Sequence, residues 1–171
     1  MRRILLAVAL AAFVPVLGRA AENPWDIAKR AAGSSTTGKL EKEVNKRLLE
    51  EGRKNQCSFK SGTAELEKGC DAKAQRLAKS LIDAKKKLNA SGVQNFKFVV
   101  SGHTDSTGSA EKNKALSADR AAVMVKQLVA KGIPPGDIES VGMGSEQPLE
   151  KPDDTPAKKA KNRRYEVQVK L

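Results

Sequence analysis

Residues 96–108 read FKFVVSGHTDSTG, which is the strongest strand signal in the chain together with the polar loop that follows it. The first half is rich in aromatic and β-branched residues, which favour a buried strand. The loop leads into residues 110–131, whose apolar positions recur at helical spacing. A strand that passes through a short polar loop into a helix is a usual place for a ligand site in layered α/β folds. Residues 102–108 therefore form the first candidate site.

Similar periodicities extend this unit in both directions along the chain. They predict short strands over residues 56–60 and 137–141, a helix over 71–88 and a last, half-buried strand over 164–171. Residues 147–161 contain three prolines and several lysines and are expected to form a loop. The resulting order, βαβαββ, predicts an α+β two-layer sandwich with a mixed four-stranded sheet and both long helices on one face.

The beginning of the chain, residues 1–20, has the pattern of a secretory signal peptide: basic residues, a short apolar run and small residues. The apolar run is short for a membrane span, which needs roughly 20 residues, although an uncleaved anchor is the alternative. Residues 21–54 are expected to form a flexible lead followed by an amphipathic helix from Lys39 to Glu51. We therefore expect an exported protein without a transmembrane span.

The net charge of the chain is +12, from 32 Lys and Arg against 20 Asp and Glu. Such a balance favours anionic partners. Export argues against nucleic acid and favours an envelope polymer that carries carboxylates, or an anionic membrane surface. The lysines on the outer face of the helix over 71–88 form either a solvated surface or a polymer-binding patch.

The two cysteines, Cys57 and Cys70, lie in the exported part and most simply form a disulfide. Closing a loop of this size stabilises a fold by about 3 kcal/mol in the chain-entropy model. His103 is the only histidine, so the sequence offers no metal site and predicts no cofactor.

The candidate site contains charges of opposite sign. Asp105 follows the strand, while Asn113, Ser117 and Arg120 form one polar row on the following helix. Asp105 and Arg120 can form a structural ion pair with each other. Alternatively they can receive a zwitterion between them, because a carboxylate accepts hydrogen bonds from an ammonium and an arginine binds a carboxylate with two donors.

A series of motifs in fixed order resembles the OmpA C-terminal-like (OmpA/MotB/Pal) peptidoglycan-binding family. The resemblance covers about residues 55–171 and rests on GHTDSTG (102–108), Asn113, LSADRA (116–121), GIP (132–134), GMGSEQP (142–148) and NRRYEV (162–167).

The resemblance implies a domain that binds the peptide stem of peptidoglycan without cleaving it. Asp105 would receive the ammonium of diaminopimelate and Arg120 its carboxylate, with Thr104, Asn113 and Arg163 lining the same pocket. The chain departs from the family pattern at residues 59–62, which read FKSG, and at residues 158–159, which read KK where Gly-Arg is common. Neither departure touches Asp105 or Arg120.

His103 beside Asp105 raises the alternative of an acid–base catalyst. No nucleophile with its own base and no metal-ligand set accompanies it, and the resemblance implies that it supports the loop. We therefore expect no catalytic residue and a protein that anchors itself or a partner to the cell wall. The alternative is a periplasmic assembly component of a motor or secretion machine in which wall binding is secondary. In either case residues 21–54 are where an envelope protein partner would bind.

Overall fold

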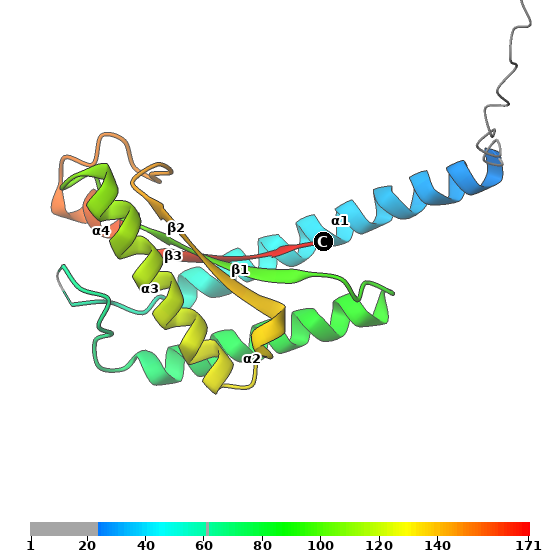
Figure 1. The fold of residues 1–171 in the computed structure, drawn as a ribbon, viewed down its shortest axis with the longest axis horizontal. Coiled ribbons are helices and arrows are strands. Elements are labelled where there is room, and N and C mark those ends of the chain that lie inside the picture. The colour runs from blue at the N-terminus through cyan, green and yellow to red at the C-terminus, as the bar shows by residue number, and fades with distance from the viewer. Residues whose placement is uncertain (1–23, 61) are drawn as a thin grey trace, which may run out of the picture. The chain divides into compact units, whose positions relative to one another are not determined.

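A computed structural model of the chain describes residues 24–60 and 62–171. The expected signal peptide, residues 1–20, and the first three residues of the lead lie outside the described residues. The chain divides into two units between Ser34 and Ser35. The unit that begins at Ser35 carries the sheet and the candidate site and is drawn in Figure 1.

The unit is a three-stranded mixed sheet with helices packed against it. The central strand β1 pairs in parallel with β2 and antiparallel with β3, which gives the order β2-β1-β3. The elements are α1 (Pro24–Lys54), α2 (Cys70–Ala90), β1 (Lys97–His103), α3 (Ala110–Ala130), the short 3₁₀ helix η1 (Pro135–Asp137), β2 (Ile138–Gly144), α4 (Pro156–Asn162) and β3 (Tyr165–Lys170). The α+β class and the mixed sheet are confirmed.

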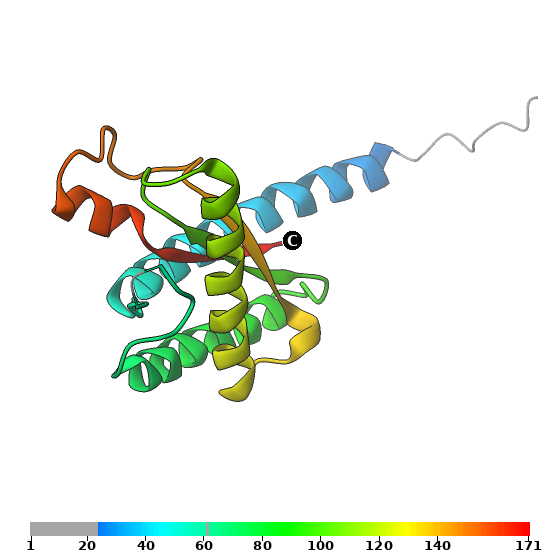
Figure 2. The ribbon, with the colours of Figure 1, turned by 60° about the vertical axis from the view of Figure 1, so that its left-hand side comes forward.

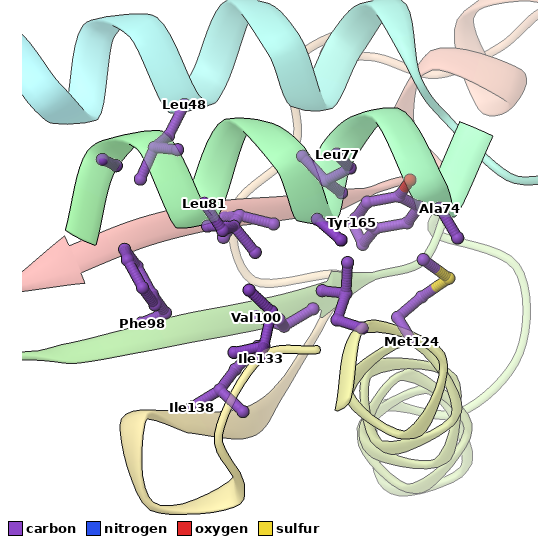
Figure 3. Packing of buried hydrophobic residues seen from close by; sticks show 14 of the residues in the cluster. Leu48, Ala74, Leu77, Leu81, Phe98, Val100, Met124, Ile133, Ile138 and Tyr165 are labelled. Carbon is purple, nitrogen blue, oxygen red and sulfur yellow. The ribbon is translucent and has the colours of Figure 1, made fainter. Parts of the chain in front are cut away.

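The core lies between one face of the sheet and the long helices. Leu77 and Leu81 of α2 pack with Phe98 and Val100 of β1, and all four are fully buried (Figure 3). Burying an aliphatic or aromatic side chain of this size contributes about 2 kcal/mol. Gly102, which meets α3, shares its strand face with Phe98 and Val100. Helices α2 and α3 therefore cover the same face, as Figure 2 shows from a second direction.

The predicted fourth strand, residues 56–60, is wrong: an isolated bridge between Phe59 and Leu66 is all that forms there. Side-chain amides take its place along the free edge of β3. Asn45 donates to the Val169 carbonyl at 3.0 Å and accepts from the Val169 amide at 2.6 Å. Gln56 donates to the Tyr165 carbonyl at 2.6 Å and accepts from the Tyr165 amide at 3.2 Å. Because these amides satisfy the edge, a further backbone strand is not needed there.

Two other predictions of local structure need correction. Helix α1 begins at Pro24, so the described part of the expected flexible lead is helical. A helix extends readily once it is nucleated. In α1 the later turns are held by Val44 and Leu48, which are buried in the core. The expected loop over 147–161 contains α4. Thr155 caps that helix by accepting from the Lys158 amide, and a proline follows at the first helical position.

The disulfide between Cys57 and Cys70 is confirmed and joins the segment after α1 to the first turn of α2. Among the described residues no helix has the length and apolarity needed to cross a bilayer.

Candidate functional site

The site begins with a close approach of α3 to the sheet. A Cβ atom on Gly102 would lie 2.1 Å from the Ser117 carbonyl oxygen, and one on Gly142 would lie 2.6 Å from the Ala118 amide nitrogen. Such distances exclude any side chain, so the glycines allow helix and strand backbones to touch. The contact fixes the start of α3 against the ends of β1 and β2.

In the polar row of α3, Asn113 and Ser117 position the neighbouring backbone, while Asn113 and Arg120 line the pocket. Ser117 accepts a hydrogen bond from the Gly144 amide at 2.8 Å, which holds the end of β2. Asn113 donates to the carbonyls of Asp105 and Thr107 at 3.3 and 3.0 Å, which holds the loop. Asn113 and Ser117 are both buried, so the loop that carries Asp105 is fixed by the helix behind it.

Asp105 is paired with Arg163 rather than with Arg120. The Arg163 Nη1 atom donates to Asp105 Oδ2 at 2.7 Å, and the Thr107 amide donates to Oδ1 at 3.0 Å. Burial alone would raise the pKa of Asp105, but the hydrogen bonds from Arg163 and Thr107 outweigh it and hold the pKa below its ordinary value. Asp105 is therefore a carboxylate at neutral pH.

Arg120 approaches the site from α3. Its Nε donates to the Thr63 carbonyl at 2.9 Å, and its Cζ atom lies 5.1 Å from the centre of the Phe59 ring. Burial and the nearby charge of Arg163 lower the pKa of Arg120, while Asp105 raises it. Arginine nevertheless stays charged in proteins. The guanidinium is thus held by one hydrogen bond and one aromatic ring, and among the described residues its terminal nitrogens form no ion pair.

Asp105 and Arg120 line the same pocket, whose volume is about 1000 Å³. That volume is at the upper end of what small-ligand pockets usually have. The pocket lies between the Asp105 loop, α3, the segment after α1, and α4 with the residues that follow it. Its charged lining consists of Asp105 and Glu67 together with Arg53, Arg120, Lys159, Lys161, Arg163 and Arg164.

Thr104 and His103 form the back of the pocket. The Thr104 amide donates to the Gly144 carbonyl at 2.9 Å, at the register shift between β1 and β2. Its hydroxyl is buried, as is His103 Nδ1, and no described residue gives either atom a hydrogen bond. Burial and the charge of Arg164 lower the pKa of His103 to about 4, against the opposing effect of Glu166. His103 is therefore neutral at pH 7, and its Nε2 atom lies 3.2 Å from the Ser101 hydroxyl of the same strand.

A second network fixes the other wall of the pocket. Asp153 accepts from the Ser106 amide at 2.8 Å and from the Ser106 hydroxyl at 2.5 Å. Asn162, at the end of α4, donates to Asp153 at 3.1 Å and accepts from the amides of Leu149 and Glu150. The hydrogen bonds that Ser106 and Asn162 donate lower the pKa of Asp153 to about 2. They join the Asp105 loop to the segment that precedes Arg163.

The five predicted ligand-binding residues, Asp105, Arg120, Asn113, Thr104 and Arg163, all line this one pocket. Sequence reasoning missed three kinds of contribution: the Asp153 network, the Phe59 ring and Lys159. The pair Thr155-Pro156 is a helix-start signal that could have placed Lys159 on a helix. Nothing local in the sequence marks Asp153 or Phe59. Among the described residues no group of His, Cys, Asp and Glu could hold a metal ion.

Parts of the chain are similar in sequence to known proteins. The chain is 42% identical over 73 residues to peptidoglycan-binding protein ArfA of Mycobacterium tuberculosis, which covers 43% of this chain and 22% of that protein. It is 38% identical over 82 residues to the peptidoglycan-associated lipoprotein of Pseudomonas aeruginosa, which covers 48% of this chain and 46% of that protein. The matched part is thus less than half the length of these relatives.

Solved structures show the same arrangement of elements. The peptidoglycan-associated lipoprotein of Burkholderia pseudomallei superposes with a TM-score of 0.52 at 26% identity, over 66% of this chain and 86% of that one. The C-terminal domain of Helicobacter pylori MotB superposes with a TM-score of 0.55 at 26% identity, over 68% of this chain and 84% of that one.

A sequence model of the OmpA family matches residues 58–163, which include the Asp105 loop, α3 and the end of α4. Domains of this family are non-enzymatic binding domains. The match takes in more than half of the chain, and the chain therefore belongs to the OmpA family.

Proposed function

We propose that this protein binds peptidoglycan non-covalently and recognises the diaminopimelate of its peptide stem. The observation that carries the proposal is the pocket in which Asp105 and Arg120 face a shared space from a strand end and a helix. The names of the relatives indicate peptidoglycan as the polymer. The charges in the pocket indicate that the bound group carries both an ammonium and a carboxylate.

Diaminopimelate presents an ammonium and a carboxylate on one carbon atom. Asp105, already a carboxylate, accepts hydrogen bonds from the ammonium, and the free terminal nitrogens of Arg120 donate to the carboxylate. Arg163 donates to one oxygen of Asp105. Binding of the ammonium is then an exchange, in which the guanidinium of Arg163 gives up that oxygen or shares it.

Co-sedimentation with purified diaminopimelate-type peptidoglycan at physiological salt tests the proposal. Asp105→Ala and Arg120→Ala should each weaken binding about ten- to a hundredfold, which is the worth of a charged hydrogen bond. The matched control for Asp105→Ala is Asp119→Ala, because Asp119 is an exposed carboxylate on α3 that does not line the pocket.

Parent and Asp119→Ala protein should pellet, and Asp105→Ala should stay in solution. If all three pellet alike, basic charge is responsible and the pocket assignment is wrong. Thermal unfolding of each variant accompanies the assay, because a misfolded Asp105→Ala protein would make its loss of binding meaningless; Asp105→Asn then replaces it as the isosteric variant.

Wall binding would anchor an exported envelope protein, or a partner attached to it, in the periplasm. A partner for residues 21–54 stays a proposal. Val44 and Leu48 are buried in the core of the unit, so the later turns of α1 use these apolar residues for packing. The likeness to MotB favours one alternative, an assembly component of a motor in which wall binding is secondary. Affinity capture with the whole protein, with and without Trp25→Ala, tests for such a partner, and recovery of none would remove that alternative.

A further inference from the structure

The pocket contains more positive charge than a single zwitterion can use. Its lining has six cationic side chains and two carboxylates. Lys161 and Arg164 are paired with Glu150 and Glu166, which lie outside the lining. Asp105 pairs with Arg163.

Three cations of the lining, Arg53, Arg120 and Lys159, have no carboxylate within ion-pair distance among the described residues. A diaminopimelate centre brings one positive and one negative charge, so its binding leaves the net charge of the pocket unchanged. The excess therefore remains after the proposed ligand group is bound.

One of these three cations, Lys159, contacts the loop that carries Asp105. Lys159 Nζ donates to the Thr107 hydroxyl at 3.1 Å, and the Thr107 amide donates to Asp105 at 3.0 Å. Arg163 contacts the other oxygen of the same carboxylate. Lys159 is half-buried and held on α4, which the Asp153 network ties to the Asp105 loop. When an ammonium displaces Arg163 from Asp105, Arg163 becomes a second unpaired donor, one helical turn from Lys159, to whose carbonyl the Arg163 amide donates.

From this geometry we infer a second anion subsite, formed by Lys159 and Arg163, that takes a carboxylate of the stem residue next to diaminopimelate. The inference rests on the proposed function. Lys159 and Asp105 both form hydrogen bonds with Thr107. The subsite is therefore close enough to Asp105 for its anion to belong to the same peptide as the ammonium. The pocket then distinguishes a stem whose glutamate keeps its free α-carboxylate from one in which that group is amidated, because an amide removes the negative charge that both cations require.

Calorimetric titration of the protein with two synthetic tetrapeptide stems tests the inference. The peptides are identical except that the glutamate α-carboxylate is free in one and amidated in the other. The free acid should bind about five- to tenfold more tightly, the worth of one partly exposed charged hydrogen bond. Lys159→Gln should reduce binding of the acid by most of that factor and so narrow the preference for the acid over the amide.

The matched control is Lys158→Gln, which removes the same charge one residue earlier. Lys158 pairs with Asp154 and does not line the pocket, so its loss should leave the preference intact. Equal binding of both peptides, or equal effects of the two lysine variants, overturns the second subsite while the proposed function stands. Binding of neither peptide overturns the proposed function itself.

Discussion

At the scale of single residues, the properties of the site depend on the partner of each charged side chain. Asp105 is not free: Arg163 holds one oxygen and the Thr107 amide holds the other. Arg120 is held by a backbone carbonyl and an aromatic ring. The proposed acceptor for an ammonium is therefore preorganised by a cation that competes with it, whereas the proposed donor for a carboxylate has no such competitor.

This competition predicts a pH effect of Arg163→Met. Arg163 helps to hold the pKa of Asp105 below its ordinary value, so its removal raises that pKa. Because binding needs the carboxylate form, the acid limit of the affinity profile should move to higher pH. The affinity for a diaminopimelate peptide, measured between pH 3 and 7, checks this prediction. Arg164→Met is not a suitable control, because Arg164 also lines the pocket. An acid limit that stays in place would show that Arg163 does not set the charge of Asp105.

Asp153 makes a separate prediction about acid stability. Its hydrogen bonds to Ser106 and Asn162 lower its pKa from the ordinary 3.8 to about 2 in the folded protein. A depressed folded-state pKa contributes stability above the unfolded value, and that contribution is lost as pH falls through the folded value. Asp153→Asn should therefore be less stable than the parent at pH 5, and the difference should shrink between pH 4 and pH 2. Urea unfolding at these pH values measures it; a difference independent of pH would mean that the charge of Asp153 contributes nothing.

At the scale of elements, the contact between α3 and the strand ends positions everything else in the site. It depends on Gly102 and Gly142, because a Cβ atom at either position would overlap the backbone of α3. The loop that carries Asp105 follows one of them, and the helix that carries Arg120 lies against both. A shift of α3 away from the sheet would separate the two ligand groups.

Gly102→Ala tests this contact. The added methyl group would lie 2.1 Å from the Ser117 carbonyl oxygen, and backbone cannot move aside as a flexible side chain can. We expect a loss of about 3 kcal/mol or more in the free energy of unfolding. Gly136→Ala is the matched control, because nothing lies within 4 Å of its Cβ position. Denaturant unfolding of both variants measures the difference, and comparable stability of the two would contradict the close approach.

The elements also mark where sequence reasoning succeeds and fails. Apolar periodicity located α2, α3 and β3, because each buries one regular face, and a run of aromatic and β-branched residues located β1. It could not foresee that Asn45 and Gln56 would satisfy the edge of β3, since those contacts join residues 124 and 109 positions apart. In the site, motifs identified Asp105 and Arg120, whereas the partner of Asp105 depends on how α4 ends and could be read only from the folded chain.

At the scale of the whole molecule, the net charge of +12 attracts the protein to an anionic polymer whether or not the pocket is filled. That general attraction acts over the Debye length and is screened by salt, whereas short directed bonds in a pocket are screened less. Two contributions to wall binding should therefore separate when the ionic strength is changed.

Raising the salt from about 0.05 to 0.5 M should weaken wall binding of the parent and leave its pocket-dependent part in place. The residual binding of Asp105→Asn should fall faster, because it depends on general charge alone. Depletion of protein from the supernatant, measured at several salt concentrations, follows both proteins. If parent and variant lose binding in parallel until neither is retained, the pocket contributes no specific affinity.

The side-chain amides of Asn45 and Gln56 that cover the edge of β3 affect how copies of this protein can associate. An open strand edge is a template on which a second chain can add its own strand, a common route to aggregation. At β3 an incoming strand would first have to displace Asn45 and Gln56, each of which makes two hydrogen bonds to the edge. The other end of the sheet, β2, has no such cover from side-chain amides among the described residues. Intermolecular strand addition between crowded copies of this protein would therefore begin at β2, so the sheet offers neighbouring molecules one edge instead of two.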